Sequence, residues 1–292
     1  MILVADSGST KTNWCLISAE HKKYYFDTEG YNPYFVNPQY ITGSLLPCLP
    51  QSLDPQKVTS IYFYGAGCFD EKLHIINTAL SGIFTNASIH AGLDLLGSAK
   101  ALLGDKQGFI AILGTGTNSC LYDGTKITAN IDSLGYLLGD EGSGFYIGRK
   151  ILSDYVREYM PLPVREEFFT TYVLTRETIM ELVYSEKLPN RFCAQFTKFI
   201  STSIADKTYT HDLIKSAFTD FFANLVARYE NYQHYTFNCT GSIGYTFKDI
   251  LTETAEAFGM QAGTIIKRPI EGLADYHAQQ LFSAIPVCPQ AS

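Results

Sequence analysis

Several features that would place a protein in a familiar class are missing from this sequence. Lys and Arg number 22 against 29 Asp and Glu, and this net charge of −7 offers no basic face to nucleic acid or to an anionic membrane. No segment approaches the roughly 18 apolar residues of a membrane span, and no basic leader precedes the short apolar run at the N-terminus. We therefore expect a cytoplasmic protein that binds neither nucleic acid nor membrane.

Cysteine and histidine also lack the spacing of metal sites. The seven cysteines include no CxxC pair and the six histidines no HxxxH pair, so neither residue type predicts a metal site, and we expect reduced, mostly buried thiols. The cysteines stand at positions 15, 48, 68, 120, 193, 239 and 288. The 292 residues are 46% hydrophobic and 17% charged, a composition that supports one large folded domain or two ordinary ones.

What the sequence does contain is a repeated pattern of apolar strand, glycine turn and second strand. Residues 2–17 read ILVADSGSTKTNWCLI, and residues 110–121 repeat the pattern as IAILGTGTNSCL. Each predicts a β-hairpin whose turn can present backbone N–H groups to an anion. A purely structural hairpin is the alternative for either one alone. Two of them in one chain indicate a duplicated domain that grips a polyphosphate, although the classical phosphate loop GxxxxGK[ST] is absent.

Two aspartates stand where strands are expected to end. Asp6 closes the first apolar run, where Mg²⁺ beside phosphates is a natural partner for its carboxylate and an Asx turn is the alternative. Asp94 follows a short strand over 87–91 and begins a helix that the spacing of Leu95 and Ala99 indicates. An ionised carboxylate there can accept a proton from a hydroxyl, and an ordinary helix cap is the alternative.

Two further glycine turns precede helices. The run GDEGSG at 139–144 sets two carboxylates between glycines, and Ser143 can cap the next helix; such loops often carry function, and a plain acidic first turn is the alternative. A strand over 235–239 leads through TGSIG into a helix over 247–258. That turn can admit a flat base against the backbone, and a plain strand-to-helix turn is equally open. Residues 150–235 predict a largely helical region whose aromatic residues form core.

The ordered set DSGSTKT, GTGTNS, GDEGSG and TGSIG resembles the N-acetylglucosamine kinases and their relatives, the ATPases that activate 2-hydroxyacyl-CoA dehydratases. Both belong to the sugar-kinase/actin superfamily, and the resemblance covers roughly 1–150 and 235–285. It implies an α/β fold of two ribonuclease-H-like domains of the actin/hexokinase type with a cleft between them. The implied domains are 1–105 and 106–270, the second with a helical elaboration over 150–235, and a helix over 271–285 that packs back on the first.

The resemblance also implies roles for individual residues, with ATP and Mg²⁺ as cofactors and a small sugar as substrate. Asp94 occupies the position of the general base, and Asp6 that of the residue that orders Mg²⁺ through water. The implied nucleotide contacts are Asp6, Gly8, Ser9, Thr10, Lys11 and Thr12 in the first loop, Gly114, Thr115, Gly116 and Thr117 in the second, and Gly241, Ser242 and Ile243 at the adenosine. The implied sugar contacts are Asn32 (in GYNP), Asp94, Asn118, Ser133, Gly135, Asp140 and Glu141.

Two departures from the family patterns shape the hypotheses. The kinases carry Gly-Trp-Gly just before GDEGS, where this chain has Ser133-Leu134-Gly135, which leaves the preference for an acetamido group open. The activators carry cysteines that hold an iron–sulfur cluster between subunits, and no arrangement here clearly supplies that site. The main hypothesis is therefore an ATP-dependent sugar kinase, with an ATPase switch acting on a protein partner, or a non-catalytic sugar sensor, as alternatives. The identity of the sugar and the choice between monomer and homodimer stay open.

Overall fold

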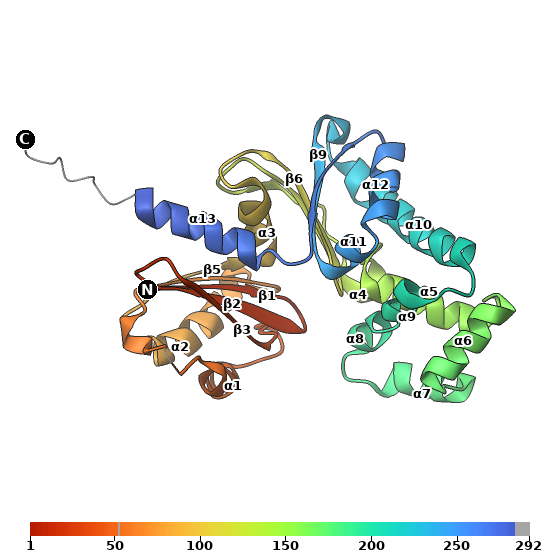
Figure 1. Cartoon of the computed structure of the whole chain (residues 1–292), viewed down its shortest axis with the longest axis horizontal. Coiled ribbons are helices and arrows are strands. Elements are labelled where there is room, and N and C mark those ends of the chain that lie inside the picture. The colour runs from red at the N-terminus through yellow and green to blue at the C-terminus, as the bar shows by residue number, and fades with distance from the viewer. Residues whose placement is uncertain (52, 284–292) are drawn as a thin grey trace, which may run out of the picture. The chain divides into compact units, whose positions relative to one another are not determined.

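The computed structural model describes residues 1–51 and 53–283. The chain divides into two compact units (Figure 1), which are described one at a time. The first consists of Met1–Lys106 together with the chain from Pro269, and the second of Gln107–Arg268. Among the described residues, none of the helices combines the length and the apolar character needed to cross a lipid bilayer.

The first unit is built on a five-stranded mixed sheet with the order β3-β2-β1-β4-β5. Its strands are β1 (Ile2–Ser7), β2 (Lys11–Ile17), β3 (Lys23–Glu29), β4 (Ser60–Gly65) and β5 (Ser88–Leu93). β1 is antiparallel to β2 and parallel to β4, which is parallel to β5. Its helices are α1 (Pro38–Leu45), α2 (Leu73–Ile83), α3 (Asp94–Leu103) and α13 (Ile270–Ser283), with 3₁₀ turns η1 (Leu46–Cys48), η2 (Pro55–Lys57) and η3 (Asp70–Lys72).

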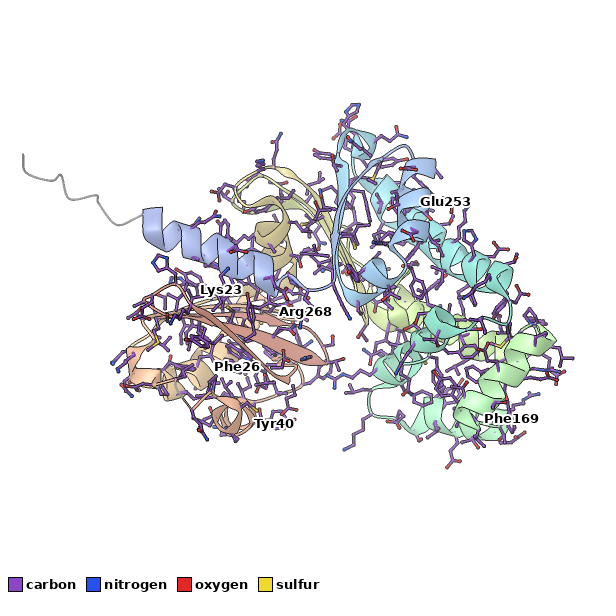
Figure 2. All side chains as sticks on the ribbon, in the orientation of Figure 1. Lys23, Phe26, Tyr40, Phe169, Glu253 and Arg268 are labelled. Carbon is purple, nitrogen blue, oxygen red and sulfur yellow. The ribbon has the colours of Figure 1, made fainter. Side chains whose placement is uncertain are left out.

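Helices cover both faces of this first sheet because side chains alternate along each strand. Leu3 and Ala5 of β1 face a core that α1 and α2 complete, whereas Ile2 and Val4 face a second core formed with α13. Trp14 of β2 is fully buried in the first of these cores and stacks on Phe26 of the edge strand β3. Figure 2 labels Phe26, and also Tyr40 on α1.

The second unit repeats this topology in a sheet of order β10-β9-β6-β7-β8. Its strands are β6 (Gly108–Leu113), β7 (Thr117–Tyr122), β8 (Ile127–Ala129), β9 (Thr236–Thr240) and β10 (Gln261–Ile266). The helices are α4 (Gly135–Leu138), α5 (Gly144–Val156), α6 (Leu162–Tyr172), α7 (Arg176–Ser185), α8 (Pro189–Ala194), α9 (Thr197–Thr202), α10 (Lys207–Asn224), α11 (Ser242–Thr246) and α12 (Lys248–Ala257), with 3₁₀ turns η4 (Val226–Arg228) and η5 (Tyr232–His234). β6 is antiparallel to β7 and parallel to β9, as β1 is to β2 and β4, so the structure confirms the α/β class and the repeated hairpin.

The helical region between β8 and β9 packs its aromatic residues into one large core. Phe168 of α6 contacts Phe196 and Phe199 from the α8–α9 segment, and Phe221 and Phe222 of α10 reach Phe237 of β9. All six of these phenylalanines are buried, with at most 3% of any side chain exposed. The expectation that this region is helical is confirmed, and most of its aromatic residues belong to the core, whereas Tyr159, Phe169 and Tyr184 are exposed.

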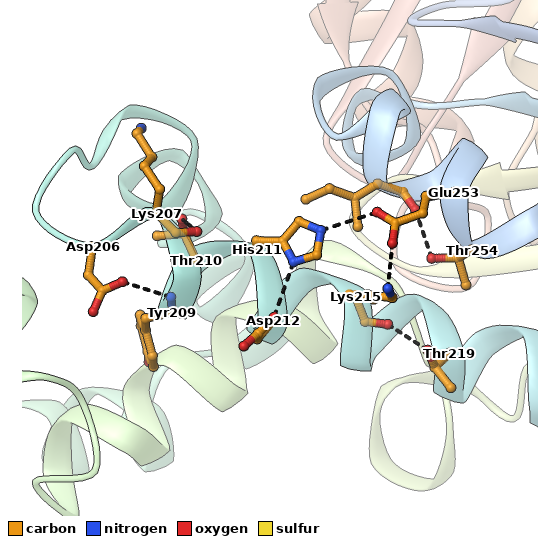
Figure 3. Close-up of polar contacts among 11 residues, drawn as sticks. Asp206, Lys207, Tyr209, Thr210, His211, Asp212, Lys215, Thr219, Glu253 and Thr254 are labelled. Carbon is orange, nitrogen blue, oxygen red and sulfur yellow. Dashed lines mark hydrogen bonds and ion pairs between the residues drawn. The ribbon is translucent and has the colours of Figure 1, made fainter. Parts of the chain in front are cut away.

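On the surface of the second unit, charged side chains join α10 to α12 (Figure 3). Glu253 of α12 forms an ion pair with Lys215 and contacts His211, both on α10. Asp212 and then Glu253 raise the pKa of the His211 imidazole above its usual value. Such exposed pairs add little to stability individually.

The structure refines the expected elements. The helix expected over 247–258 is α12, Lys248–Ala257, and a separate short helix that was not expected, α11, precedes it over Ser242–Thr246. The edge strands β3 and β10 gave no apolar signal strong enough to be predicted. Of the expected helix over 271–285, α13 contains the part to Ser283; residues 284–285, like Cys288, lie outside the described residues. Of the six described cysteines, only Cys48 is exposed.

Candidate functional site

The first glycine turn is held in place by hydroxyl groups at the ends of its two strands. β1 and β2 pair so that Ser7 lies opposite Thr12, and their hydroxyls are 2.7 Å apart in the interior. Thr12 Oγ1 donates to the carbonyl of Glu29 at 2.8 Å, and Ser7 Oγ accepts the backbone N–H of Tyr31 at 3.0 Å. The turn itself closes through a hydrogen bond from Gly8 N–H to the Lys11 carbonyl at 2.9 Å.

The chain that follows β3 packs directly against this turn. Gly30 N–H donates to the Thr10 carbonyl at 3.0 Å, and a Cβ at Gly30 would lie 2.3 Å from the carbonyl oxygen of Gly8. The segment Gly30–Asn32 is thereby brought beside the first glycine turn, although they are far apart in sequence. The side chain of Lys11, by contrast, forms an ion pair with Asp27 of β3 at 2.7 Å, with both side chains about half exposed.

Asp6, one residue before the end of β1, has its carboxylate beside an amide. Asn13, its pairing partner on β2, donates from Nδ2 to Asp6 Oδ2 at 3.3 Å. Asn13 is 9% exposed, and its Oδ1 is a buried oxygen with no hydrogen-bond partner among the described residues. A carboxylate beside an unsatisfied amide oxygen is a donor set that suits a hydrated Mg²⁺ ion, so the residues present fit that metal. The described residues contain no cluster of three His, Cys, Asp or Glu side chains.

Asp94 lies at the same edge of the first sheet as Asp6. β1, β4 and β5 are parallel, with Asp6 level with Tyr64 and Gly65 level with Leu93, so their carboxyl ends share one edge, where open α/β sheets bind ligands. Asp94 is the first residue of α3, and its Oδ1 accepts the N–H of Leu95 at 2.8 Å. Burial raises the pKa of Asp94 to about 6, against the opposing effect of the N–H groups at the helix start.

Three residues from the end of β4 and the loop after β3 complete this edge. The Asn32 side chain lies against Gly67, where a Cβ would be 2.5 Å from Asn32 Oδ1. That oxygen accepts the N–H of Tyr34 at 3.0 Å, which leaves the amide nitrogen available to a ligand hydroxyl. Cys68 is 2% exposed, and burial raises the pKa of its thiol to about 12, with a further contribution from the charge of Asp94. Asn32 and Asp94, both predicted from the sequence, thus interact with two adjacent residues, Gly67 and Cys68.

In the second unit, the second glycine turn is shaped by the acidic loop. Asp140 Oδ1 accepts the N–H of Thr117 at 3.1 Å, and a Cβ at Gly116 would lie 3.1 Å from Asp140 Oδ2. Thr117 Oγ1 donates to the Glu141 carbonyl at 2.7 Å. Gly114 N–H closes the turn on the Gly116 carbonyl at 3.0 Å. The second glycine turn and the acidic loop, which are separate in sequence, are therefore joined by hydrogen bonds in the fold.

The acidic loop needs an unusual backbone to make these contacts. Asp140 has φ 57 and is 7% exposed, and burial raises the pKa of its carboxyl despite the Thr117 N–H. Asp140 N–H donates to the Ser133 carbonyl at 2.9 Å, and a Cβ at Gly139 would lie 2.1 Å from the same oxygen. Ser133 therefore holds the loop through its backbone. Glu141 Oε1 accepts from Asn224 of α10 at 3.2 Å.

The turn before α11 meets the second glycine turn from the neighbouring strand. β9 is parallel to β6, with Thr240 level with Ile112, so Gly241 lies at the same edge as Gly114. Gly241 has φ 116, and a Cβ there would be 2.3 Å from the Leu113 carbonyl oxygen. Gly144, at the start of α5, donates its N–H to the Gly114 carbonyl at 2.8 Å. The N-terminal ends of α5 and α11 thus both lie at this edge, where backbone N–H groups favour anions.

Two predicted sugar contacts lie beside this group. Asn118 Oδ1 accepts from the N–H of Ser119 and from Nδ2 of Asn130, each at 2.9 Å. Gly135 has φ 66 and begins the short helix α4, whose Leu137 and Leu138 are 75% and 79% exposed. Leu134, in the segment Ser133–Gly135, is 58% exposed as well, so this stretch presents apolar side chains to solvent.

Comparisons with known proteins agree with this architecture. The structure of a Porphyromonas gingivalis protein proposed to be an N-acetylglucosamine kinase matches this chain with 38% sequence identity and a TM-score of 0.90. The match covers 96% of this chain and 100% of that protein. The chain belongs to the N-acetylglucosamine kinase family. A protein of Chromobacterium violaceum, also proposed to be an N-acetylglucosamine kinase, matches at 16% identity and TM-score 0.69, over 94% and 98% of the two chains. No family model matches the chain, and no curated protein matches it either.

More distant structures share the fold of this N-acetylglucosamine kinase relative. A glucokinase of Streptomyces griseus, solved with glucose and AMPPNP, matches at 10% identity and TM-score 0.54, over 95% and 99% of the two chains. An MreB protein of Spiroplasma citri, solved with AMPPNP, matches at 9% identity and TM-score 0.58, over 97% of each chain. At these identities the likeness shows the fold alone, and it confirms the expected actin/hexokinase type.

Sequence reasoning missed three residues of the site in this family member. Asn13 was overlooked because an asparagine inside a strand gives no motif, although its alignment with Asp6 across a two-stranded hairpin was available. Gly67 and Cys68 follow β4, and only the fold shows that they interact with Asn32 and Asp94. A glycine or polar residue just after each parallel strand was the signal that could have found them.

Proposed function

We propose that this protein is an ATP-dependent kinase that phosphorylates a hydroxyl of a small sugar, N-acetylglucosamine or a related amino sugar. The observation that carries the proposal is the position of Asp94. Its carboxylate lies at the helix start beyond β5, on the sheet edge that carries the first glycine turn, and its charge acts on Cys68, the neighbour of the Gly67 that Asn32 contacts. Membership of the N-acetylglucosamine kinase family supports the choice of substrate class.

Asp94 has the properties of a general base. Its pKa of about 6 leaves it ionised at neutral pH yet basic enough to accept a proton as the sugar oxygen attacks. In the proposed reaction that oxygen forms a bond to the γ-phosphorus, the bond from this phosphorus to the β-γ bridging oxygen breaks, and ADP leaves. The hydroxyl proton passes to the carboxylate of Asp94. Asn32 Nδ2 is placed to donate to a neighbouring hydroxyl and so to orient the sugar.

The two glycine turns are proposed to bind phosphate oxygens through backbone N–H groups and the hydroxyls of Ser9, Thr10 and Thr115. Asp6, with Asn13 beside it, would hold Mg²⁺ through water. When bound, that ion neutralises charge that develops on the phosphates. The Gly241–Ile243 turn is proposed to lie against the adenosine. Most of the rate acceleration then comes from positioning and charge neutralisation.

The experiment that tests this proposal measures ADP release with ATP and Mg²⁺ over a panel of amino sugars and neutral hexoses. Sugar-dependent ADP release, with the phosphosugar identified by mass spectrometry, is the expected result. Sugar-independent hydrolysis that a second protein stimulates would instead favour an ATPase switch. Sugar binding without ATP turnover would indicate a sensor, and either result would overturn the kinase.

A further inference from the structure

Arginine is unevenly distributed along this chain. The sequence has seven arginines, none of them before residue 149, and four follow in quick succession: Arg149, Arg157, Arg165 and Arg176. The structure brings all four together around two adjoining cavities in the helical region of the second unit. In a chain with a net charge of −7, this is a local reversal of sign.

The larger cavity, of about 820 Å³, is formed by α5, α7, α8 and the turn that follows α5. Three arginines line it, Arg149, Arg157 and Arg176. None of these three forms an ion pair with any described residue. Its volume falls within the roughly 300–1,000 Å³ of small-molecule sites.

One carboxylate lines this cavity among the described residues, and it has a partner of its own. Glu158 forms an ion pair with Arg165 at 2.9 Å. The adjoining cavity, of about 680 Å³, shares three lining residues with the larger one: Val156, Glu158 and Arg176. Phe169 of α6, which Figure 2 labels, also lines this second cavity. With Glu158 neutralised, the three remaining arginines give the larger cavity a net positive charge.

Apart from Ser153, the remaining residues that line the larger cavity are apolar or aromatic. Ile179 and Met180 of α7 line it together with Tyr159 and Tyr184. Arg149 is held over the rings of Phe145 and Tyr146, with its guanidinium carbon 5.4 and 5.1 Å from the two ring centroids. Stacking of this kind fixes the plane of a guanidinium group while leaving its edge free to bind an anion.

We infer that this cavity binds a small organic anion, in which a carboxylate or phosphate group is attached to an apolar or aromatic body. Arginine's planar fork binds both oxyanions in a bidentate way, and the tyrosine and aliphatic walls would enclose the body. A free sugar lacks both the charge and the apolar surface that this lining selects. The inference is independent of the proposed kinase activity.

The cavity is separate from the candidate site in the same unit. α5 meets the second glycine turn at its first residue, through the hydrogen bond from Gly144 to Gly114. The α5 residues of the cavity begin at Arg149 and continue through Leu152 and Val156 to the other end of the helix. One helix therefore connects two sites of different ligand chemistry.

The test is isothermal titration calorimetry of the full chain with phenyl phosphate and with phenylacetate. We expect at least one to bind with a dissociation constant below about 1 mM, as a well-held ligand of this size should, and the tighter of the two names the anionic group. Inorganic phosphate and benzyl alcohol, which each carry half of the required chemistry, should bind at least roughly tenfold more weakly. Equal binding by inorganic phosphate, or no binding by either aromatic anion, would overturn the inference.

Variants locate the binding. Arg157→Gln combined with Arg176→Gln removes two guanidinium groups from exposed positions and should weaken binding by roughly 10- to 100-fold, the scale of charge-assisted hydrogen bonds. The single variant Arg176→Gln serves the same purpose should the double variant fold poorly. Arg228→Gln, at an exposed arginine outside both cavities, is the matched control and should leave binding unchanged. Unaltered binding in both cavity variants would overturn the inference. If the variants instead changed only the oligomeric state of the protein, measured by analytical ultracentrifugation, the inference would also be overturned, and an interface between copies of the chain would be favoured.

Discussion

Gly30 packs so closely against Gly8 that any larger residue at position 30 would collide with the first glycine turn. A Cβ at position 30 would lie 2.3 Å from the Gly8 carbonyl oxygen and 2.7 Å from the carbonyl carbon of Ser9. Both neighbours are backbone atoms of a turn that hydrogen bonds already fix on either side. The proposed phosphate turn and the proposed sugar contact are thus coupled through one glycine.

Gly30→Ala should therefore displace the turn and impair the site. We expect unfolding free energy to fall by roughly 1–3 kcal/mol, the usual cost of overpacking, and the KM for ATP to rise. Urea denaturation and steady-state kinetics measure the two effects. Gly43→Ala is the control, because no atom lies within 4 Å of a Cβ there and the residue sits within α1. That substitution should be neutral or stabilising by up to about 1 kcal/mol, and an equal loss in both variants would contradict the argument.

Asp94→Asn should lose activity without losing the fold. The asparagine oxygen can still accept the Leu95 N–H, but the side chain can no longer take a proton. We expect kcat to fall by roughly 10²- to 10⁴-fold, the usual scale for a general base, with ATP binding retained. Asp70→Asn, at an exposed carboxylate of the same unit, is the control. Turnover at the wild-type rate in the Asp94 variant would remove this residue from the mechanism.

The raised pKa of Asp94 also predicts how activity and stability depend on pH. Activity should fall as pH drops through about 6, where the carboxyl becomes protonated in the folded protein. Stability changes in the opposite sense: above the unfolded pKa of 3.8 the unfolded chain releases a proton that the folded protein still holds, so stability is lost as pH rises from about 4 to about 6. At pH 8 Asp94→Asn should thus be more stable than the wild type, on the order of 1–3 kcal/mol, and no more stable near pH 3.5. A constant difference at both pH values would show that ionisation is not the cause.

The sequence could predict those parts of the structure whose signal is local. Gly8 and Gly114 lie between apolar strands, so both hairpins were visible, and Ser143 caps α5 as its position suggested, accepting the Tyr146 N–H at 3.1 Å. Asp94 stood out because a carboxylate begins a helix directly after an apolar strand. In each case the residues that determine the structure are neighbours in the chain.

What the sequence could not predict depends on contacts between distant segments. β3 is an edge strand whose residues alternate only weakly between buried and exposed, so Lys23–Glu29 carries no clear strand pattern. The short helix α11 lies in a stretch whose glycines indicate a turn, so its helical geometry has no clear local signal. The approach of Gly30 to Gly8, and the bond from Thr117 to Asp140, each require the complete fold.

Two substitutions of Asp140 should have opposite effects. Asp140→Ala leaves the buried N–H of Thr117 without its acceptor and places alanine at φ 57, so we expect a loss of roughly 1–3 kcal/mol in unfolding free energy. Asp140→Asn keeps an oxygen for Thr117, tolerates the left-handed backbone and removes a charge whose burial raises the carboxyl pKa. At pH 7 it should be as stable as the wild type or more so. Equal losses in the two variants, measured by urea denaturation, would show that the carboxylate charge itself is needed.

Val173 offers a prediction that is independent of function. It ends α6 with φ 52 and ψ 38, a left-handed conformation that is unfavourable for a β-branched residue by roughly 1–2 kcal/mol. The position is held because the Val173 N–H donates to the Phe169 carbonyl at 2.7 Å, while its side chain is 71% exposed and contributes little to the core. Glycine adopts this conformation without a steric penalty and is the usual residue at such a helix end.

Val173→Gly should therefore stabilise the protein by about 1 kcal/mol, after allowance for the greater freedom of glycine in the unfolded chain. Thermal unfolding should show this as a rise in Tm of about 2–4 °C. Val173→Ala separates the causes, because it removes the branched side chain but keeps a Cβ in the left-handed region. If backbone conformation is the source of the strain, the alanine variant should gain clearly less than the glycine variant. If the two variants gain equally, the branched side chain is responsible, and a fall in Tm for both would mean that the exposed valine makes a stabilising contact.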